Sequence, residues 1–136
     1  MSLVTCQLAL MDVPDLNAVL AAVRRVLRPR AAFVAVISHP CFLAPRAQTV
    51  RLPDGHLARV VRDYLHEEFW RSANPSAVRR AGNHHRTLST YLNGLVRHGF
   101  LIQEAAEPAA SGDYAQLQPV HGSIPIFFGF RASRAT

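Results

Sequence analysis

The chain has 136 residues, of which 49% are apolar and 18% are charged. This composition is typical of one globular domain with its own core and excludes a disordered chain. The net charge of +6 comes from arginine alone, because the 15 basic residues include no lysine. The arginines are scattered, so the charge does not indicate a nucleic-acid partner. No apolar run approaches the roughly 18 residues of a bilayer-spanning helix, so we expect no membrane partner.

The N-terminal stretch "MSLVTCQLALMDV" lacks the basic start and the small-residue cleavage site of a secretory signal. The sequence therefore predicts a cytoplasmic protein. In that compartment Cys6 and Cys41 are expected to be reduced, buried and chemically inert.

Two apolar strands and one helix make up the first third of the chain. Residues 3–10 and 31–38 are apolar at nearly every position, which predicts strands buried on both faces. Between them, apolar residues at three- and four-residue spacing predict a helix that begins after an N-cap at Asp15 and ends at Pro29. The order strand, helix, strand indicates a right-handed crossover unit.

Residues 39–83 form a long insert with little periodicity. Within it, residues 57–65 fit either a short amphipathic helix or an extended, lid-like segment, and the sequence leaves both open. A clearer helix follows, with Thr87 as its N-cap and Gly99 as its left-handed C-cap.

The last part of the chain predicts two strands, at 100–107 and 124–132. The connector between them, residues 108–123, is too polar for a helix, so the two strands are expected to form an antiparallel hairpin that closes a parallel sheet. The fold class is therefore α/β.

The first strand presents an inconsistency. A strand this apolar belongs in the middle of a sheet, but it starts three residues from the beginning of the chain and the later strands supply only one neighbour. Its other edge is expected to be open and to drive dimerisation or aggregation.

Four stretches together resemble the class I S-adenosylmethionine-dependent methyltransferases of the small-molecule branch. They are "LVTCQLALMDVPDLNAVLAAVRRVLRP", "FVAVISHPCF", "HRTLSTYLNGLVRHGF" and "IPIFFGFRA". Their order corresponds to the C-terminal half of that fold, from its fourth strand onward, with the last strand inserted antiparallel. The resemblance implies a partial Rossmann-like sheet, S-adenosylmethionine as cofactor and a small molecule as methyl acceptor.

The chain also departs from this family. No two of its seven glycines stand one residue apart, so the glycine-rich turn that holds the cofactor is missing. Ser2 replaces the usual aspartate before the fourth strand, and Arg30–Ala31 replaces a glycine pair. A left-handed Arg30 would cost about 1 kcal/mol relative to glycine.

We therefore expect residues 1–136 to be a single partial methyltransferase domain with an insert or lid at 39–83 and with the cofactor-binding half absent. Its partner would be a complementing N-terminal half or a second copy of the chain. The alternative is a non-catalytic remnant or interaction module of the same fold.

Candidate site residues gather where the parallel strands end, because ligands of open α/β sheets bind beyond the carboxyl ends of the strands. Gln7, Leu8 and Ala9 end the first strand and are assigned to the cofactor. His39 ends the second strand, and residues 84–86 precede the next crossover helix at the same edge.

Methyl transfer from a sulfonium requires alignment and often a base. We expect His85 first and His39 second as catalytic groups, with His84 and Arg86 binding the substrate. An exposed or backbone-bonded loop histidine is an equally good interpretation of His84. The His and Cys spacings match no usual zinc pattern, so no metal is expected.

Overall fold

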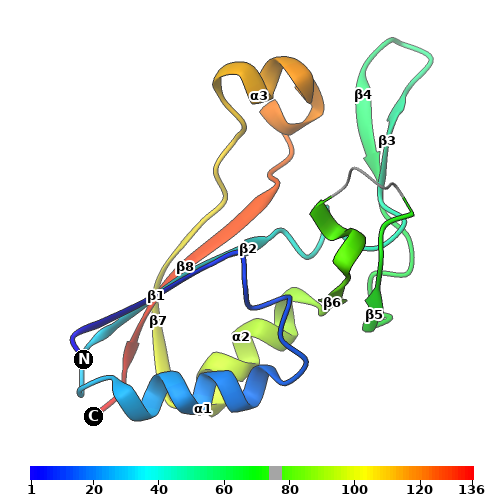
Figure 1. Ribbon diagram of the computed structural model, residues 1–136. Helices are drawn as coiled ribbons and strands as arrows, with labels where there is room; N and C mark the ends of the chain where they lie inside the picture. Colours follow the sequence, from blue (N-terminus) through cyan, green and yellow to red (C-terminus); the bar gives the residue numbers. More distant parts are fainter. Residues whose placement is uncertain (74–77) are drawn as a thin grey trace.

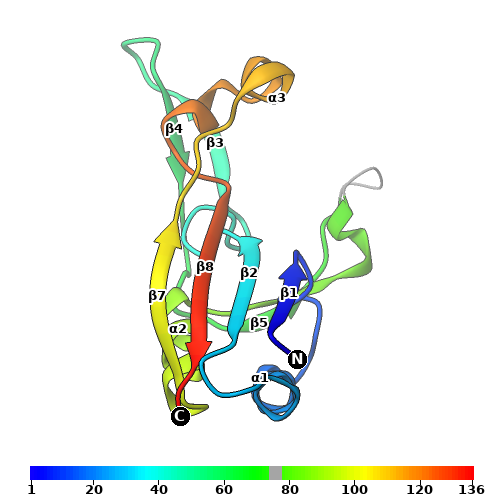
Figure 2. The ribbon, with the colours of Figure 1, turned by 90° about the vertical axis from the view of Figure 1, so that its left-hand side faces the viewer.

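The computed structural model describes residues 1–73 and 78–136, and its main body is a four-stranded sheet (Figures 1 and 2). The strand order is β1-β2-β8-β7. β1 and β2 are parallel, and β8 is antiparallel to both of its neighbours. The strands are β1 (Leu3–Gln7), β2 (Ala32–Ser38), β7 (Phe100–Ala106) and β8 (Phe127–Arg134). The predicted α/β class, with a last strand inserted antiparallel, is confirmed.

Two helices cover one face of this sheet, α1 (Leu16–Val26) and α2 (Leu88–Arg97). Both begin at the predicted caps. An Asp15 carboxylate oxygen accepts a hydrogen bond from the Ala18 amide at 2.9 Å, and the Thr87 hydroxyl accepts one from the Thr90 amide at 3.3 Å. These bonds satisfy amide groups that a helix start otherwise leaves unpaired.

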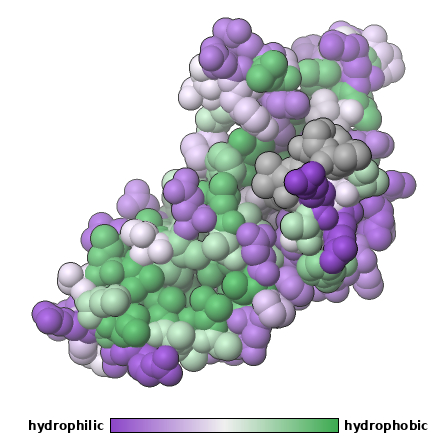
Figure 3. Space-filling model, in the orientation of Figure 1, coloured by the Kyte–Doolittle hydropathy of each residue, from purple (hydrophilic) through white to green (hydrophobic). Residues whose placement is uncertain are grey.

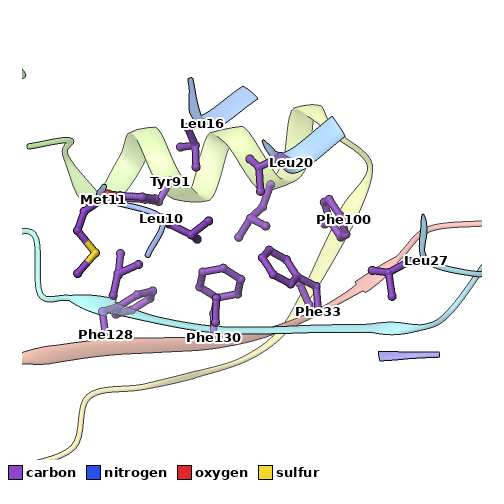
Figure 4. Close-up of a cluster of buried hydrophobic side chains, with 14 of the residues drawn as sticks. Leu10, Met11, Leu16, Leu20, Leu27, Phe33, Tyr91, Phe100, Phe128 and Phe130 are labelled. Carbon is purple, nitrogen blue, oxygen red and sulfur yellow. The ribbon is translucent and has the colours of Figure 1, made fainter. Parts of the chain in front are cut away.

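The core lies between the helices and the sheet and is rich in phenylalanine (Figure 4). The Phe33 ring packs edge-on against Phe130 with centroids 5.5 Å apart, and it also contacts Phe100 at 5.7 Å. Leu20 of α1 and Leu95 of α2 are each only 1% exposed and close the core from the helix side. Aromatic burial of this kind supplies most of the apolar area that holds the two layers together.

The first strand differs from its prediction. It was expected to span residues 3–10 and to be buried on both faces, but β1 ends at Gln7 and alternates between exposed and half-buried positions. It lies at the edge of the sheet and pairs only with β2 among the described strands. The apolar run misled the prediction because residues 8–11 leave the sheet, and Leu10 and Met11 enter the core from the following loop.

The insert is extended. It contains the hairpin β3 (Gln48–Arg51) and β4 (Leu57–Val60), the short strand β5 (Glu68–Trp70), the 3-10 turn η1 (Val78–Ala81) and the short strand β6 (Asn83–His85). β5 pairs antiparallel with β6. Of the two interpretations of residues 57–65, the extended one is confirmed and the helix is wrong.

The connector between β7 and β8 also differs from its prediction. It was expected to contain no helix, but it forms α3 (Gly112–Leu117) and the 3-10 turn η2 (Pro119–Gly122). α3 has no buried residue, so it needs no apolar stripe, and the polarity of the segment was a poor criterion for so short a helix. Tyr114 of α3 stacks on the buried His121 with ring centroids 6.5 Å apart.

The left-handed C-cap predicted at Gly99 is confirmed, and the left-handed conformation considered for Arg30 is observed. Arg30 has a φ of +64° and Gly99 has a φ of +70°. Arginine side chains donate to backbone carbonyls at the ends of both helices. At the end of α2, Arg24 donates to the Gly99 carbonyl at 3.1 Å. At the end of α1, Arg134 donates to the carbonyls of Arg24 and Leu27. Cations are favourable at these positions because the helix dipole is negative there.

None of the helices in residues 1–73 and 78–136 combines the length and the hydrophobicity that crossing a membrane requires.

Candidate functional site

A large cavity opens at the carboxyl ends of β1 and β2, between the insert and the β7–β8 connector. Its volume is about 870 Å³, which is within the range of small-molecule sites. The lining is mainly apolar with a few polar groups. The lining residues are Leu8, Met11, Asp12, Ser38, Leu43, Ala81, Gly82, Asn83, Pro108, Ala109, Ala110, Ser111, Tyr114, Ile126 and Phe127.

Leu8 is the lining residue at which β1 leaves the sheet. Its backbone has a φ of +52°, while its amide still donates to the Val36 carbonyl of β2 at 2.8 Å. A left-handed leucine is unusual and costs about 1–2 kcal/mol. Strained backbone of this kind is concentrated at ligand sites, so the outlier supports a functional role for this corner of the cavity.

A buried arginine ties the insert to the loop between β1 and α1. Arg86 is 8% exposed, and its guanidinium donates to three backbone carbonyls. The acceptors are Leu10 at 3.0 Å, Val13 at 2.6 Å and Pro14 at 3.0 Å. The guanidinium donors therefore hold the loop that follows β1 and are not directed into the cavity.

The strand β6 also contacts the loop between β1 and α1. The His84 amide donates to the Met11 carbonyl at 2.7 Å, which brings Asn83 to the cavity wall with 3% exposure. Gly82 precedes it with a φ of +95°, and a Cβ atom there would lie 2.3 Å from the Phe69 ring. Only glycine fits this turn, because both the conformation and the close ring exclude a side chain.

The predicted histidine cluster does come together, but beside the cavity and not in it. His39, His84, His85 and Arg86 all line a second space of only about 20 Å³. That volume holds about one water molecule and no organic substrate. The two spaces share a wall that includes Ser38 and Asn83.

Both ring nitrogens of His39 have partners. Its Nδ1 accepts from the Cys41 amide at 3.2 Å, so Nε2 carries the proton and donates to the Glu107 carboxylate at 2.5 Å. His39 itself is 1% exposed. The hydrogen bond between His39 and Glu107 joins the end of β2 to the segment that follows β7.

The His85 ring is likewise oriented by the insert. Its Nε2 donates to the Tyr64 carbonyl at 2.8 Å, and the two rings pack edge-on with centroids 5.8 Å apart. This bond leaves Nδ1 as the nitrogen of His85 that can accept a proton. Burial raises the pKa of the Tyr64 hydroxyl, although the hydrogen bond from the Leu88 amide acts in the opposite direction.

The insert also supplies acceptors for the first amides of α2. The Tyr64 hydroxyl accepts from the Leu88 amide at 2.7 Å, and a Glu67 carboxylate oxygen accepts from the Thr87 amide at 3.0 Å. The hydroxyls of Thr87 and Thr90 donate to the same oxygen. Partial burial opposes ionisation, but these bonds prevail and hold the pKa of Glu67 below its ordinary value.

The predicted site residues therefore fall into two groups. Of the three assigned to the cofactor, Leu8 lines the large cavity, whereas Gln7 and Ala9 are not among its lining residues. His39 and His85, expected to be catalytic, and His84 and Arg86, expected to bind substrate, lie behind the shared wall. These roles stay predictions. Among the described residues, no three His, Cys, Asp or Glu side chains are grouped to hold a metal.

Both cysteines are free thiols. Burial raises the pKa of the Cys6 thiol above its ordinary value, although hydrogen bonds from the backbone of Ala9 and Leu10 act in the opposite direction. A raised pKa lowers the thiolate fraction, which agrees with the expectation of an inert cysteine.

The predicted site residues included none of the polar residues that line the cavity, which are Asp12, Ser38, Asn83, Ser111 and Tyr114. Asp12 could have been found, because a carboxylate just past an apolar strand stands at the carboxyl edge of a parallel sheet. Asn83 had no signal of its own, because only the tie to Met11 brings it to the wall. Tyr114 lies in the connector that was taken as structureless.

Comparisons with known proteins identify the fold. No family model matches the chain, and no curated protein matches it in sequence. Among solved structures, an S-adenosylmethionine-dependent methyltransferase from Mesorhizobium loti superposes with a TM-score of 0.81 at 27% identity. That match covers 98% of this chain and 62% of the other.

Two further structures agree. A protein from Listeria monocytogenes, assigned to the same class, has a TM-score of 0.80 at 22% identity, over 99% of this chain and 62% of its own. The glycopeptide N-methyltransferase MtfA, crystallised with S-adenosylmethionine, has a TM-score of 0.59 at 16% identity, over 98% of this chain and 57% of its own.

The chain thus has the fold of the class I S-adenosylmethionine-dependent methyltransferases and spans about three fifths of the length of these neighbours. The resemblance inferred from the sequence is confirmed at the level of the fold.

The arginine that holds the β1–α1 loop gives a first test. Replacing Arg86 by Met keeps much of the volume but removes the donor from one buried and two partly buried carbonyls, so we expect a loss of about 2 kcal/mol in the free energy of unfolding. Urea denaturation measures it. Arg97→Met, an exposed site in the last turn of α2, is the control and should change stability by less than about 0.5 kcal/mol. Equal effects of the two variants would contradict the role of Arg86.

The Glu67 carboxylate gives a second test, which is the pH dependence of the stability of the fold. A carboxyl group whose pKa is lowered in the folded state stabilises the fold at pH values above its ordinary pKa, here 4.5. This contribution is lost as pH falls through the folded-state pKa. Glu67→Gln should therefore be less stable than the natural protein at neutral pH, and the difference should shrink as the solution is acidified below 4.5. Thermal unfolding across this range measures it. Gln103→Asn, at an exposed position of β7 without a titratable group, is the control and should change stability by the same amount at every pH.

Proposed function

We propose that this chain forms the acceptor-binding side of an S-adenosylmethionine-dependent methyltransferase that methylates a small molecule. The observation that carries the proposal is the 870 Å³ cavity at the carboxyl ends of β1 and β2. In open α/β sheets this edge is where ligands bind. The fold that surrounds the cavity is shared with methyltransferases over 98% of the chain.

The reaction is an in-line displacement at the methyl carbon of S-adenosylmethionine. A nucleophilic atom of the acceptor forms a bond to this carbon while the carbon–sulfur bond breaks. The bonding pair passes to sulfur, and the acceptor releases its proton to a base or to solvent. Alignment is the main requirement, so the walls that hold the acceptor contribute most to the rate.

The chain contributes part of the cofactor's surroundings. Leu8, with its strained backbone, stands at the corner of the cavity nearest the end of β1. Wall residues that would complete the nucleoside site are proposed to come from a segment outside the 136 residues, as the predicted complementing half requires. Of the two predicted bases, His85 is the better candidate, because its bond to the Tyr64 carbonyl occupies only Nε2, but as a residue behind the shared wall it would have to act on the cavity through that wall.

The open side of β1 is suited to receive such a segment. An apolar surface runs along β1 and the adjoining side of α1 (Figure 3). Leu3 is 52% exposed and Val26 is 41% exposed. The partly buried residues Val4, Cys6, Leu8, Val19 and Val23 lie beneath the same surface. A parallel strand and a helix would cover it, and a second copy of the chain is the other partner that the sequence suggested.

Ligand-detected NMR tests the cofactor side of the proposal. Saturation transfer from the protein to S-adenosylhomocysteine at millimolar concentration reports even weak binding, and we expect a signal with the 136-residue chain. Ala109→Trp, which fills the cavity from an exposed lining position, should abolish the signal. Ala21→Trp, on the exposed side of α1, is the control. An absence of transfer to the natural chain would overturn the cofactor role proposed for these 136 residues, including that of Leu8.

Sedimentation tests the open edge. We expect the isolated chain to self-associate as its concentration rises, because an exposed apolar strand edge pairs with other strands. Leu3→Lys should weaken this association by placing a charge on the edge. Leu65→Lys, at an exposed leucine in the insert, should not. A natural chain that stays monomeric at high concentration would contradict the partner part of the proposal.

A further inference from the structure

The charge of the cavity is opposite to the charge of the protein. The chain carries a formal net charge of +6 with 15 arginines and 7 histidines. None of these side chains is among the residues that line the cavity in the described parts of the chain. Among the described lining residues, the carboxylate of Asp12 is the single charged group.

Arginines near the cavity are committed elsewhere. Arg86, behind the shared wall, has its guanidinium on three carbonyls of the β1–α1 loop. Arg59 is close enough to Tyr114 for an electrostatic interaction, but its guanidinium donates to the Phe42 carbonyl at 2.8 Å and to the Thr49 hydroxyl at 3.3 Å. An anion placed in the cavity would therefore lose its hydration without gaining a cationic partner from the lining residues that the structure describes.

The Asp12 carboxylate, in contrast, is available. Asp12 is exposed, and its side chain makes no hydrogen bond or ion pair with any residue that the structure describes. Its backbone amide donates to the Ala9 carbonyl at 2.9 Å, which fixes the residue in the turn directly after the strained Leu8. The carboxylate thus stands at the end of β1 beside an apolar space that a hydrophobic group can fill.

We propose that the cavity binds largely apolar amines, with Asp12 as the partner of the ammonium group, and that it rejects carboxylates and phosphates of the same shape. The apolar wall of Met11, Ile126 and Phe127 would bury the body of the ligand. Neutral hydrogen-bonding groups such as Asn83 are compatible with an amine or a hydroxyl. The inference names the class of methyl acceptor. It rests on the proposed function only in treating the bound amine as that acceptor.

The exposure of Asp12 to solvent limits its contribution to the free energy of amine binding. An ion pair accessible to solvent is worth at most about 1 kcal/mol, which is about fivefold in affinity. The rest of the selectivity comes from the desolvation of an anion, which removal of Asp12 does not relieve. Asp12→Asn should therefore weaken amine binding severalfold without converting the cavity into an anion site.

Three isosteric probes test the proposal by saturation-transfer titration of the full chain: 2-phenylethylamine, 2-phenylethanol and phenylacetate. We expect the amine to bind most tightly, the alcohol more weakly and the carboxylate below detection. Asp12→Asn should weaken the amine about threefold to fivefold and leave the alcohol unchanged. Asp113→Asn removes the same charge next to Tyr114 from a residue outside the lining, and it should leave all three unchanged.

Several outcomes would overturn the inference. They are phenylacetate binding as tightly as the amine, amine binding that is insensitive to Asp12→Asn, and equal effects of Asp12→Asn and Asp113→Asn, which would indicate net charge alone. Ala109→Trp should remove amine binding, and an unchanged affinity would place the probe elsewhere. Amine binding without any S-adenosylhomocysteine signal would support the amine site and overturn the cofactor role proposed for this chain, so the two failures are distinguishable.

Discussion

The buried guanidinium of Arg86 is the contact on which the candidate site depends. It binds the carbonyls of Leu10, Val13 and Pro14, so the loop between β1 and α1 has one fixed path. The same loop accepts the His84 amide at Met11. A segment that is more than seventy residues away in sequence is thereby held against the carboxyl end of β1, and the cavity acquires its wall. Without this contact the end of the insert would have little to fix it, because β5 and β6 are only three residues long.

The same chemistry recurs at the other end of the molecule and explains the basic composition. Arg24 binds carbonyls at the end of α2, and Arg134 binds carbonyls at the end of α1. A planar guanidinium can serve two or three carbonyl oxygens at once, which the ammonium group of lysine does less well. Several of the positive charges therefore stabilise turns and helix ends of the fold. They are compatible with a cavity that is itself without a cation among its described lining residues.

The insert joins stability and function in one element. Its residues Tyr64 and Glu67 cap the start of α2, and its end carries Asn83 to the cavity. His85 and His39 are placed by the same arrangement, each with a ring nitrogen bound to a neighbouring segment. The histidines thus form a second layer behind the wall. A movement of their rings would act on the cavity through the residues that line both spaces, which are Met11, Ser38, Leu43 and Asn83.

The sequence by itself determined the class of the fold, both major helices with their caps and the edge of the sheet at which the polar segments meet. These follow from local periodicity, from capping chemistry and from the rule that parallel strands end at one edge. Only the tertiary structure decided that β1 ends at Gln7 and is not buried on both faces, that the connector contains α3, and that Asp12 and Asn83, not the histidines, face the large cavity. The physical reason is that backbone hydrogen bonds between distant segments set the direction of these side chains, and no spacing within a single segment records such bonds. The pairing of Arg86 with the loop after β1 is the clearest case, because a basic residue before a helix is equally compatible with a ligand and with a carbonyl.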